Sequence, residues 1–75
     1  MKVQYFKAKE ESNRYNKGQM VWILFNFANH LHTYHKWRGS GRYVYGVIDK
    51  FSPLVGEIKT IDVGDDFAKR ITKTL

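Results

Sequence analysis

The side chains best suited to chemistry lie around a glycine turn in the middle of the chain. From residue 35 to residue 45 the sequence HKWRGSGRYVY alternates cationic with aromatic side chains. Arginine and lysine neutralise phosphates, and a tryptophan or tyrosine ring stacks on an unpaired base with about 1–3 kcal/mol. We therefore expect the segment to contact DNA or RNA through six side chains: Lys36, Trp37, Arg38, Arg42, Tyr43 and Tyr45. Alternatively, Trp37 and Tyr43 anchor a junction between two elements and the glycines only turn the chain.

The uneven charge of the chain supports this interpretation. Residues 1–38 contain seven Lys or Arg against two Glu, and residues 39–75 contain six against five carboxylates. No acidic residue occurs in the 37 positions before Asp49, so this stretch should present positive potential to polyanions. Arg14 and Lys17 are expected to assist phosphate binding from a preceding loop. The alternative is that the acidic C-terminal third folds back over these cations with Asp49, Glu57, Asp62, Asp65 and Asp66.

Three histidines, His30, His32 and His35, raise the question of a metal site. On a helix, His32 and His35 share roughly one side while His30 points away. On a strand, His30 and His32 share a face and His35 lies on the other. Neither element brings all three together and no carboxylate is near in sequence, so we expect no metal. We expect His35 to be a hydrogen-bonded residue packed inside the protein and the other two to lie at the surface.

The sequence offers little support for catalysis. It has no cysteine nucleophile, no Gly-x-Ser-x-Gly elbow and no glycine-rich phosphate loop that ends in Gly-Lys-Ser/Thr. Helix capping accounts for the adjacent carboxylates of Asp65 and Asp66. We therefore expect a binding module without a cofactor rather than an enzyme.

The fold that positions these side chains depends on whether the segment from Gln19 to Arg38 is a helix or a pair of strands. Its apolar side chains fall at helical spacing and no Gly or Pro interrupts them, which predicts a helix over about 19–37. The residues that make this stripe are Phe27, Ala28, Leu31, Tyr34 and His35. The rival interpretation is a strand over 20–27, a turn, and a strand over 31–37, because MVWILFNF has the composition of a buried strand.

The flanking segments give clearer patterns. A short strand near the N-terminus is followed by a polar loop over 7–18. Residues 42–51 and 57–63 alternate apolar and polar side chains and predict a hairpin around Ser52–Gly56. Asp65 is expected to be the N-cap of a C-terminal helix that ends near residue 74.

The predicted fold is therefore α+β: a small antiparallel sheet with a central helix over about 19–37 and a C-terminal helix over about 65–74, in the order β-α-β-β-α. If residues 20–37 are strands, the alternative is a five-stranded SH3/OB-like small barrel with a C-terminal helix.

Length and composition fit one small domain over residues 1–75. The chain is 43% apolar and 16% aromatic, too hydrophobic for a disordered tail, and the lack of cysteine excludes disulfides. No signal peptide is evident, and the longest apolar run, Met20 to Phe25, is far below the ~20 residues that cross a bilayer. We expect a cytoplasmic protein without membrane contact.

Two resemblances point in the same direction. The stretch WRGSGRYVYGVID…GEIKTIDVGDD resembles the strand pair of RelE/ParE-type toxins, small basic domains in which a Gly-Arg-Tyr/Phe strand leads into a β-hairpin after a helical hairpin. This chain offers one helix in place of two. The same segment, ending in DDFAKRI, is similar in outline to the strand–strand–helix of integrase arm-binding domains, which lay a sheet into DNA. We assign the chain to neither family.

Three functional hypotheses follow from the sequence. The first is a small, non-catalytic nucleic-acid-binding module. The second is a protein-interaction or inhibitory module, self-association included, in which exposed Trp22, Phe25 or Trp37 form an apolar patch. The third is a RelE/ParE-like ribonuclease toxin, in which His35, Arg38 and Arg42 would act on RNA.

Overall fold

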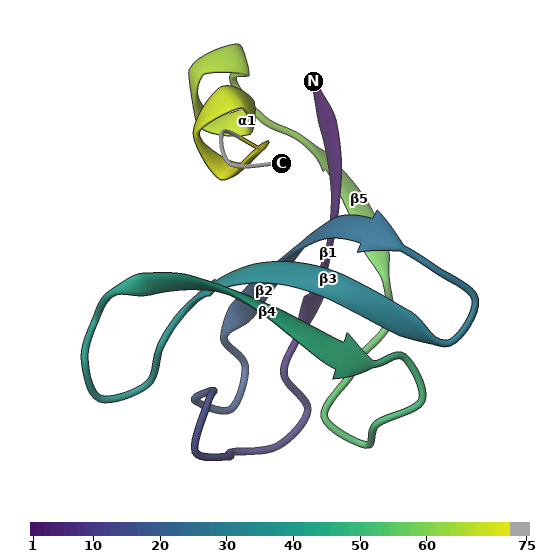
Figure 1. Cartoon of the computed structure of the whole chain (residues 1–75), viewed down its shortest axis with the longest axis vertical. Helices are drawn as coiled ribbons and strands as arrows, with labels where there is room; N and C mark the ends of the chain where they lie inside the picture. Colours follow the sequence, from purple (N-terminus) through teal and green to yellow (C-terminus); the bar gives the residue numbers. More distant parts are fainter. Residues whose placement is uncertain (73–75) are drawn as a thin grey trace.

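Five strands and one short helix make up the computed structural model, which describes residues 1–72 (Figure 1). The elements are β1 (Lys2–Lys7), β2 (Met20–Asn26), β3 (His30–Lys36), β4 (Tyr43–Asp49), β5 (Lys59–Asp62) and α1 (Asp65–Thr72). All neighbouring strands are antiparallel and follow the order β4-β3-β2-β1-β5. The first strand of the chain therefore lies between β2 and β5.

The predicted central helix over 19–37 is wrong, and with it the β-α-β-β-α layout. These residues form the antiparallel hairpin of β2 and β3. In β3 the side chains of Leu31, Thr33 and His35 are buried and those between them are not, which is the period of a strand. Side chains four residues apart share a face in a helix and also in a strand, so Phe27, Leu31 and His35 fit both periods. The five strands and C-terminal helix agree in number with the rival interpretation.

The predicted hairpin between residues 42–51 and 57–63 is also wrong. Among the described residues β4 pairs with β3 alone, and β5 pairs with β1 at the opposite edge of the sheet. The intervening chain crosses between these edges, where Ala8 bridges to Val55 and the Lys9 amide donates to the Leu54 carbonyl at 3.0 Å. The turn residues around Pro53 are equally compatible with a tight hairpin and with such a crossing.

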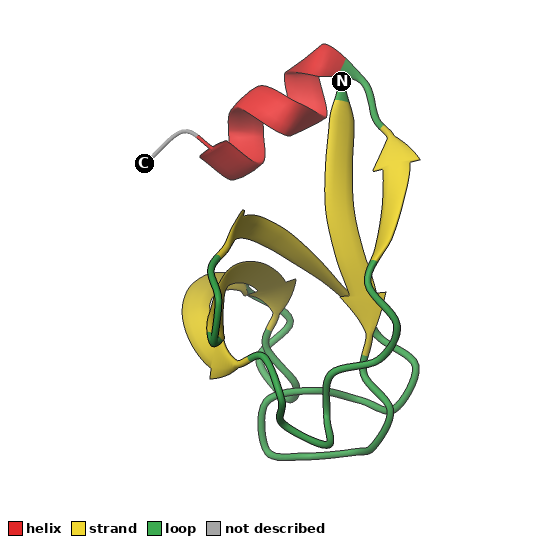
Figure 2. Ribbon diagram, turned by 90° about the vertical axis from the view of Figure 1, so that its right-hand side faces the viewer, coloured by secondary structure: helices red, strands yellow, loops and turns green. Residues whose placement is uncertain are grey.

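The sheet curls between loops on one side and the helix on the other (Figure 2). Its main core lies on the loop side, where Leu54, Val55 and Ile58 pack against a buried cluster. The cluster consists of Phe6, Ala8, Tyr15, Val21, Ile23, Leu31 and Ile48. Burial of this apolar area, at about 25 cal/mol per Å², is the main source of stability.

Helix α1 attaches to the other face of the sheet. Its Ala68 and Ile71 are buried, and the ring of Phe67 lies 4.9 Å from that of Trp22. The Tyr45 hydroxyl donates to the carbonyl oxygen of Ile71 at 3.2 Å. The Gly64 carbonyl accepts the first helical hydrogen bond, from the Ala68 amide, so Gly64 takes the N-cap place predicted for Asp65. The predicted last turn, over residues 73–74, lies outside the described residues.

Candidate nucleic-acid interface

The fold brings two cationic loops side by side. Loop 8–19, which joins β1 to β2, and loop 37–42, which joins β3 to β4, are hydrogen-bonded to each other. The Arg38 amide donates to the Arg14 carbonyl at 3.0 Å, and the Gln19 side chain donates to the Lys36 carbonyl. We call this region the basic end and define it by Arg14, Lys17, Lys36, Arg38 and Arg42.

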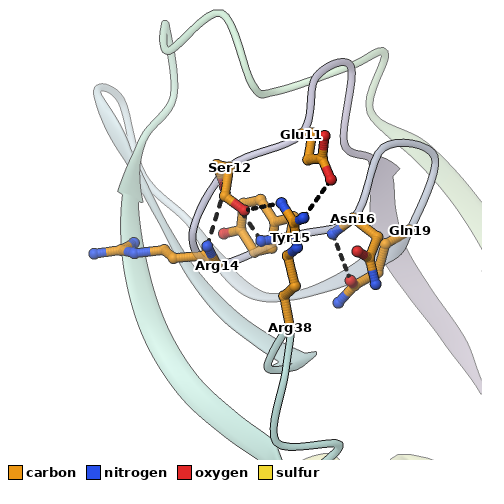
Figure 3. A network of polar contacts seen from close by, with 7 residues as sticks. All are labelled: Glu11, Ser12, Arg14, Tyr15, Asn16, Gln19 and Arg38. Carbon is orange, nitrogen blue, oxygen red and sulfur yellow. Dashed lines mark hydrogen bonds and ion pairs between the residues drawn. The ribbon is translucent and has the colours of Figure 1, made fainter.

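Short-range hydrogen bonds give loop 8–19 its shape (Figure 3). The Ser12 hydroxyl accepts from the amides of Arg14 and Tyr15, both at 3.1 Å, and the Tyr15 ring enters the core. The Gln19 amide donates to the Asn16 carbonyl at 3.1 Å, closing a turn in which Gly18 has φ of 82°. A positive φ at this place favours glycine, and it leaves Lys17 exposed at the tip of the turn.

The cations of the basic end differ in their surroundings. The guanidinium of Arg38 forms an ion pair with Glu11 and also donates to the Ser12 carbonyl at 2.9 Å (Figure 3). Arg14 donates to the Val47 carbonyl at 3.1 Å. Within residues 1–72, Lys17, Lys36 and Arg42 are exposed and form no ion pair.

The acidic residues of the C-terminal third have other partners or none. Asp62 and Asp65 lie 3.3 and 3.7 Å from the N-terminal ammonium, and Glu57 lies 3.9 Å from Lys59. The Asp49 carboxylate accepts from the Phe51 amide at 2.8 Å. In the described part of the chain, none of these carboxylates, nor that of Asp66, pairs with a cation of the basic end.

A buried polar cluster lies beneath the basic end. His35 is 1% exposed, and its two ring nitrogens, the Tyr15 hydroxyl and the Thr33 hydroxyl have no hydrogen-bond partner among the described residues. Burial, together with the nearby charge of Arg14, lowers the pKa of His35. Burial also raises the pKa of Tyr15, although Arg14 opposes this shift. The prediction that His35 packs inside the protein is confirmed, but the hydrogen bonds expected for its ring are not formed with any of the described residues.

Three tyrosines stand together on the sheet face opposite the core. Tyr34 of β3 is paired in register with Tyr45 of β4, at 4.8 Å between ring centroids. The rings of Tyr34 and Tyr43 are nearly parallel, with 5.1 Å between centroids and 17° between planes. Tyr43 is 52% exposed and Tyr45 43%. We call Tyr34, Tyr43 and Tyr45 the tyrosine face.

Apart from Trp37, the predicted site residues fall into two groups that meet at one position. Lys36 is the cross-strand partner of Tyr43, so it joins the basic end to the tyrosine face. Trp37 belongs to neither exposed group, because its half-buried ring lies 6.0 Å from that of the buried His35. Tyr34 was missed, because the predicted helix placed it on a buried stripe. Alternation along HLHTYHK, residues 30–36, was the signal that could have found it.

A row of aromatic side chains extends from the tyrosine face toward the centre of the sheet. Trp22 of β2 is the register partner of Tyr34 on one side and of Tyr5 on the other. The rings of Trp22 and Tyr5 are half-buried, and Phe67 of the helix covers Trp22. Arg70, in the last helical turn, is close enough to Tyr34 to oppose the rise in its pKa that burial and the neighbouring tyrosines cause.

The remaining sites considered from the sequence give no further candidate. His30 and His32 do share a face, with 5.3 Å between ring centroids, and no group of three or more potential metal ligands occurs within residues 1–72. No helix in the same range has the length and apolar character needed to span a membrane. Comparison with known proteins finds no matching family model, no matching curated protein and no matching solved structure.

Proposed function

We propose that this chain is a small, non-catalytic nucleic-acid-binding module whose phosphate contacts come from the basic end. The observation that supports this most is the direct hydrogen bonding between loops 8–19 and 37–42, which gathers cations from distant parts of the sequence. Phosphate backbones favour such clusters, because each neutralised phosphate releases a counterion. The proposed setting is the cytoplasm.

The charges around the basic end support the same proposal. Lys17, Lys36 and Arg42 remain exposed without an ion pair in the described residues, and Glu11 is the one carboxylate that pairs with a cation of this group. The guanidinium of Arg42 offers a fork of donors that suits phosphate oxygens. Among the described residues, Lys17, Lys36 and Arg42 can therefore contact phosphate without first breaking an ion pair.

A salt titration tests the proposal. The affinity of the protein for RNA, single-stranded DNA and duplex DNA would be measured by fluorescence anisotropy between about 50 and 200 mM salt. The double variant Lys17→Gln/Arg42→Gln should bind more weakly than the original chain. Its salt dependence, the slope of log K against log salt, should be shallower by about 0.7–0.9 for each phosphate that the protein no longer neutralises.

The matched control is the double variant Lys2→Gln/Lys59→Gln, which removes the same charge from exposed positions on the paired strands β1 and β5. It should retain most of the affinity and the original slope. Equal losses of affinity in both variants would mean that binding depends on net charge alone and not on the basic end. No binding to any nucleic acid at low salt would refute the proposal.

A protein-interaction role is the second candidate, favoured by an exposed apolar patch at the turn between β2 and β3. The rings of Phe25 and Phe27 are stacked 5.9 Å apart and both are exposed. Of the residues expected in such a patch, Phe25 is exposed, whereas Trp22 and Trp37 are half-buried. Sedimentation at several concentrations tests self-association, which the variant Phe25→Ser/Phe27→Ser should abolish.

The geometry gives less support to a ribonuclease. His35 is buried, so its imidazole cannot exchange a proton with a substrate unless loop 8–19 first moves away. The resemblance to RelE/ParE-type toxins relied on a hairpin between residues 42–51 and 57–63, but β4 and β5 lie at opposite edges of the sheet. Within residues 1–72 the chain also lacks a helix before β4.

A further inference from the structure

The tyrosine face presents an unfinished stack of aromatic rings. Tyr34 and Tyr43 lie nearly parallel, and Tyr34 is the one ring that Tyr43 meets among the described residues. Tyr43 belongs to β4, which is an edge strand, and more than half of its surface is exposed. A flat ring of another molecule could therefore continue the stack on the free side of Tyr43.

The charges beside this face are positive. Lys36 lies across from Tyr43 in the register of β3 and β4, and Arg42 precedes Tyr43 in the chain. Arg70 of the helix opposes the rise in the pKa of Tyr34 through its positive charge. The carboxylate of β4, Asp49, is at the far end of the strand, four residues beyond Tyr45. A partner that combines flat rings with negative charge is complementary to this surface.

From this arrangement we infer that the protein binds unpaired nucleic-acid strands, with a base stacked on the exposed ring of Tyr43 and phosphates held by Lys36 and Arg42. This inference rests on the proposed function and narrows its ligand from nucleic acid in general to single strands. In a duplex the faces of the bases are already stacked on one another, so a tyrosine ring cannot reach them. A single strand exposes both its base faces and its phosphates.

Lys36 gives this site its continuity with the basic end. Its backbone carbonyl is held by the Gln19 side chain of loop 8–19, and its neighbour across the strands is Tyr43. Phosphates that follow the basic end would therefore bring the attached bases to the ring of Tyr43. The side chains that bind phosphate and those that stack on bases meet at this one cross-strand pair.

The decisive probe is a pair of strands that differ only in their bases. A thymidine strand of about 12 nucleotides would be compared with an abasic strand of the same length, which keeps every phosphate. Heat-annealed duplex DNA is the third probe. We expect the thymidine strand to bind at least about five-fold more tightly than the abasic strand, because stacking adds to the phosphate contacts.

Variants of Tyr43 test whether its ring causes the difference in affinity between the thymidine strand and the abasic strand. Tyr43→Ser should lose most of the preference for the thymidine strand while it keeps the original salt slope, because every phosphate contact remains. Tyr43→Phe should preserve the preference, since the phenyl ring stacks equally well. Phe51→Ser is the control, because this ring is 76% exposed but lies outside the tyrosine face. Circular dichroism would establish that each variant is folded.

Each outcome bears on a different claim. If the abasic strand binds as tightly as the thymidine strand, or if the duplex is preferred and Tyr43→Ser changes nothing, the base site is refuted while the proposed function stands. If none of the three probes binds at low salt, and an RNA strand of the same length does not bind either, the proposed function itself fails. A dimer that Tyr43→Ser disrupts, in the absence of strand binding, would identify a second copy as the occupant and overturn the inference.

Discussion

At the scale of single residues, Glu11 has an effect on the basic end that its position in the sequence does not reveal. Its carboxylate pairs with Arg38 and reduces the positive charge available to a ligand, while the Arg38 side chain is also held by the Ser12 carbonyl. Glu11→Gln should therefore free a cation that stays in place. We expect tighter binding to single strands and a salt slope steeper by about 0.7.

Glu10→Gln is the matched control for this variant, because Glu10 is adjacent, exposed and without an ion pair in the described residues. Both variants raise the net charge by one, so only a local effect of Arg38 can separate them. Anisotropy titrations that give identical slopes for the two variants would contradict the role assigned to Glu11.

His35 makes stability depend on pH. Burial and the charge of Arg14 lower its folded-state pKa below the unfolded value of about 6.5, and Tyr15, the other titratable group beside it, stays neutral in this range. Below pH 6.5 the unfolded chain binds a proton that the folded protein does not. The free energy of unfolding should therefore fall as the pH drops, by up to about 1.4 kcal/mol per pH unit, and be level above pH 6.5.

Urea unfolding between pH 5 and 8 measures this dependence. His35→Gln should remove most of the fall in the free energy of unfolding at acid pH. If the free energy of unfolding of His35→Gln falls with pH as steeply as that of the original chain, groups other than His35 cause the dependence.

At the scale of elements, the crossing between β4 and β5 depends on a close approach of two backbones. A side-chain carbon at Gly56 would lie 2.5 Å from the carbonyl oxygen of Lys7, closer than real contacts allow, so one segment must shift. We expect Gly56→Ser to reduce the free energy of unfolding by about 1–3 kcal/mol. Thermal or urea unfolding provides the measurement.

Gly64→Ser is the comparison variant, because the added atoms meet open space and serine is a good N-cap. It should leave the free energy of unfolding within about 0.5 kcal/mol of the original. Equal losses of stability in the two variants would mean that the close approach to the Lys7 carbonyl is not the reason why position 56 requires glycine.

Local sequence patterns predicted the elements in which the spacing of apolar side chains fits either a helix or a strand, but not both. Alternation located the strands near residues 2–7 and 43–49, and the helix after Gly64 was located by the acidic residues that open it. The hairpin of β2 and β3 was missed because Leu31 and His35, four residues apart, satisfy helix and strand alike. The crossing to β5 was missed because strand partners are chosen by packing over the whole chain.

The site was predictable to a similar degree. Composition alone grouped the cations of the basic end, because the stretch around them has no carboxylate. It could not show that Glu11 reaches Arg38, since that pair forms only when loops 8–19 and 37–42 meet. Tyr34 was missed together with the strand that contains it, because its register with Tyr45 exists only between strands.

At the scale of the whole molecule, the sheet can be completed only by contacts between the two ends of the chain. β1 pairs with β5, so that Lys2 lies opposite Asp62. Folds dominated by such distant pairings fold slowly, over milliseconds to seconds, because a long loop must close before its contacts form. Stopped-flow refolding followed by tryptophan fluorescence should give its main phase in this range, and complete folding within microseconds would contradict it.

Tyr45 takes part in two tasks at once, since its ring belongs to the tyrosine face and its hydroxyl holds the Ile71 carbonyl in the last described turn of the helix. A ligand that restricts the motion of the Tyr45 ring is expected to restrict the last described turn of the helix as well. Because coupling between two sites is reciprocal, a helix that packs firmly on the sheet should in turn favour ligand binding. Ligand binding at the tyrosine face would then slow the exchange of helical amide hydrogens with heavy water, although the helix itself does not contact the ligand.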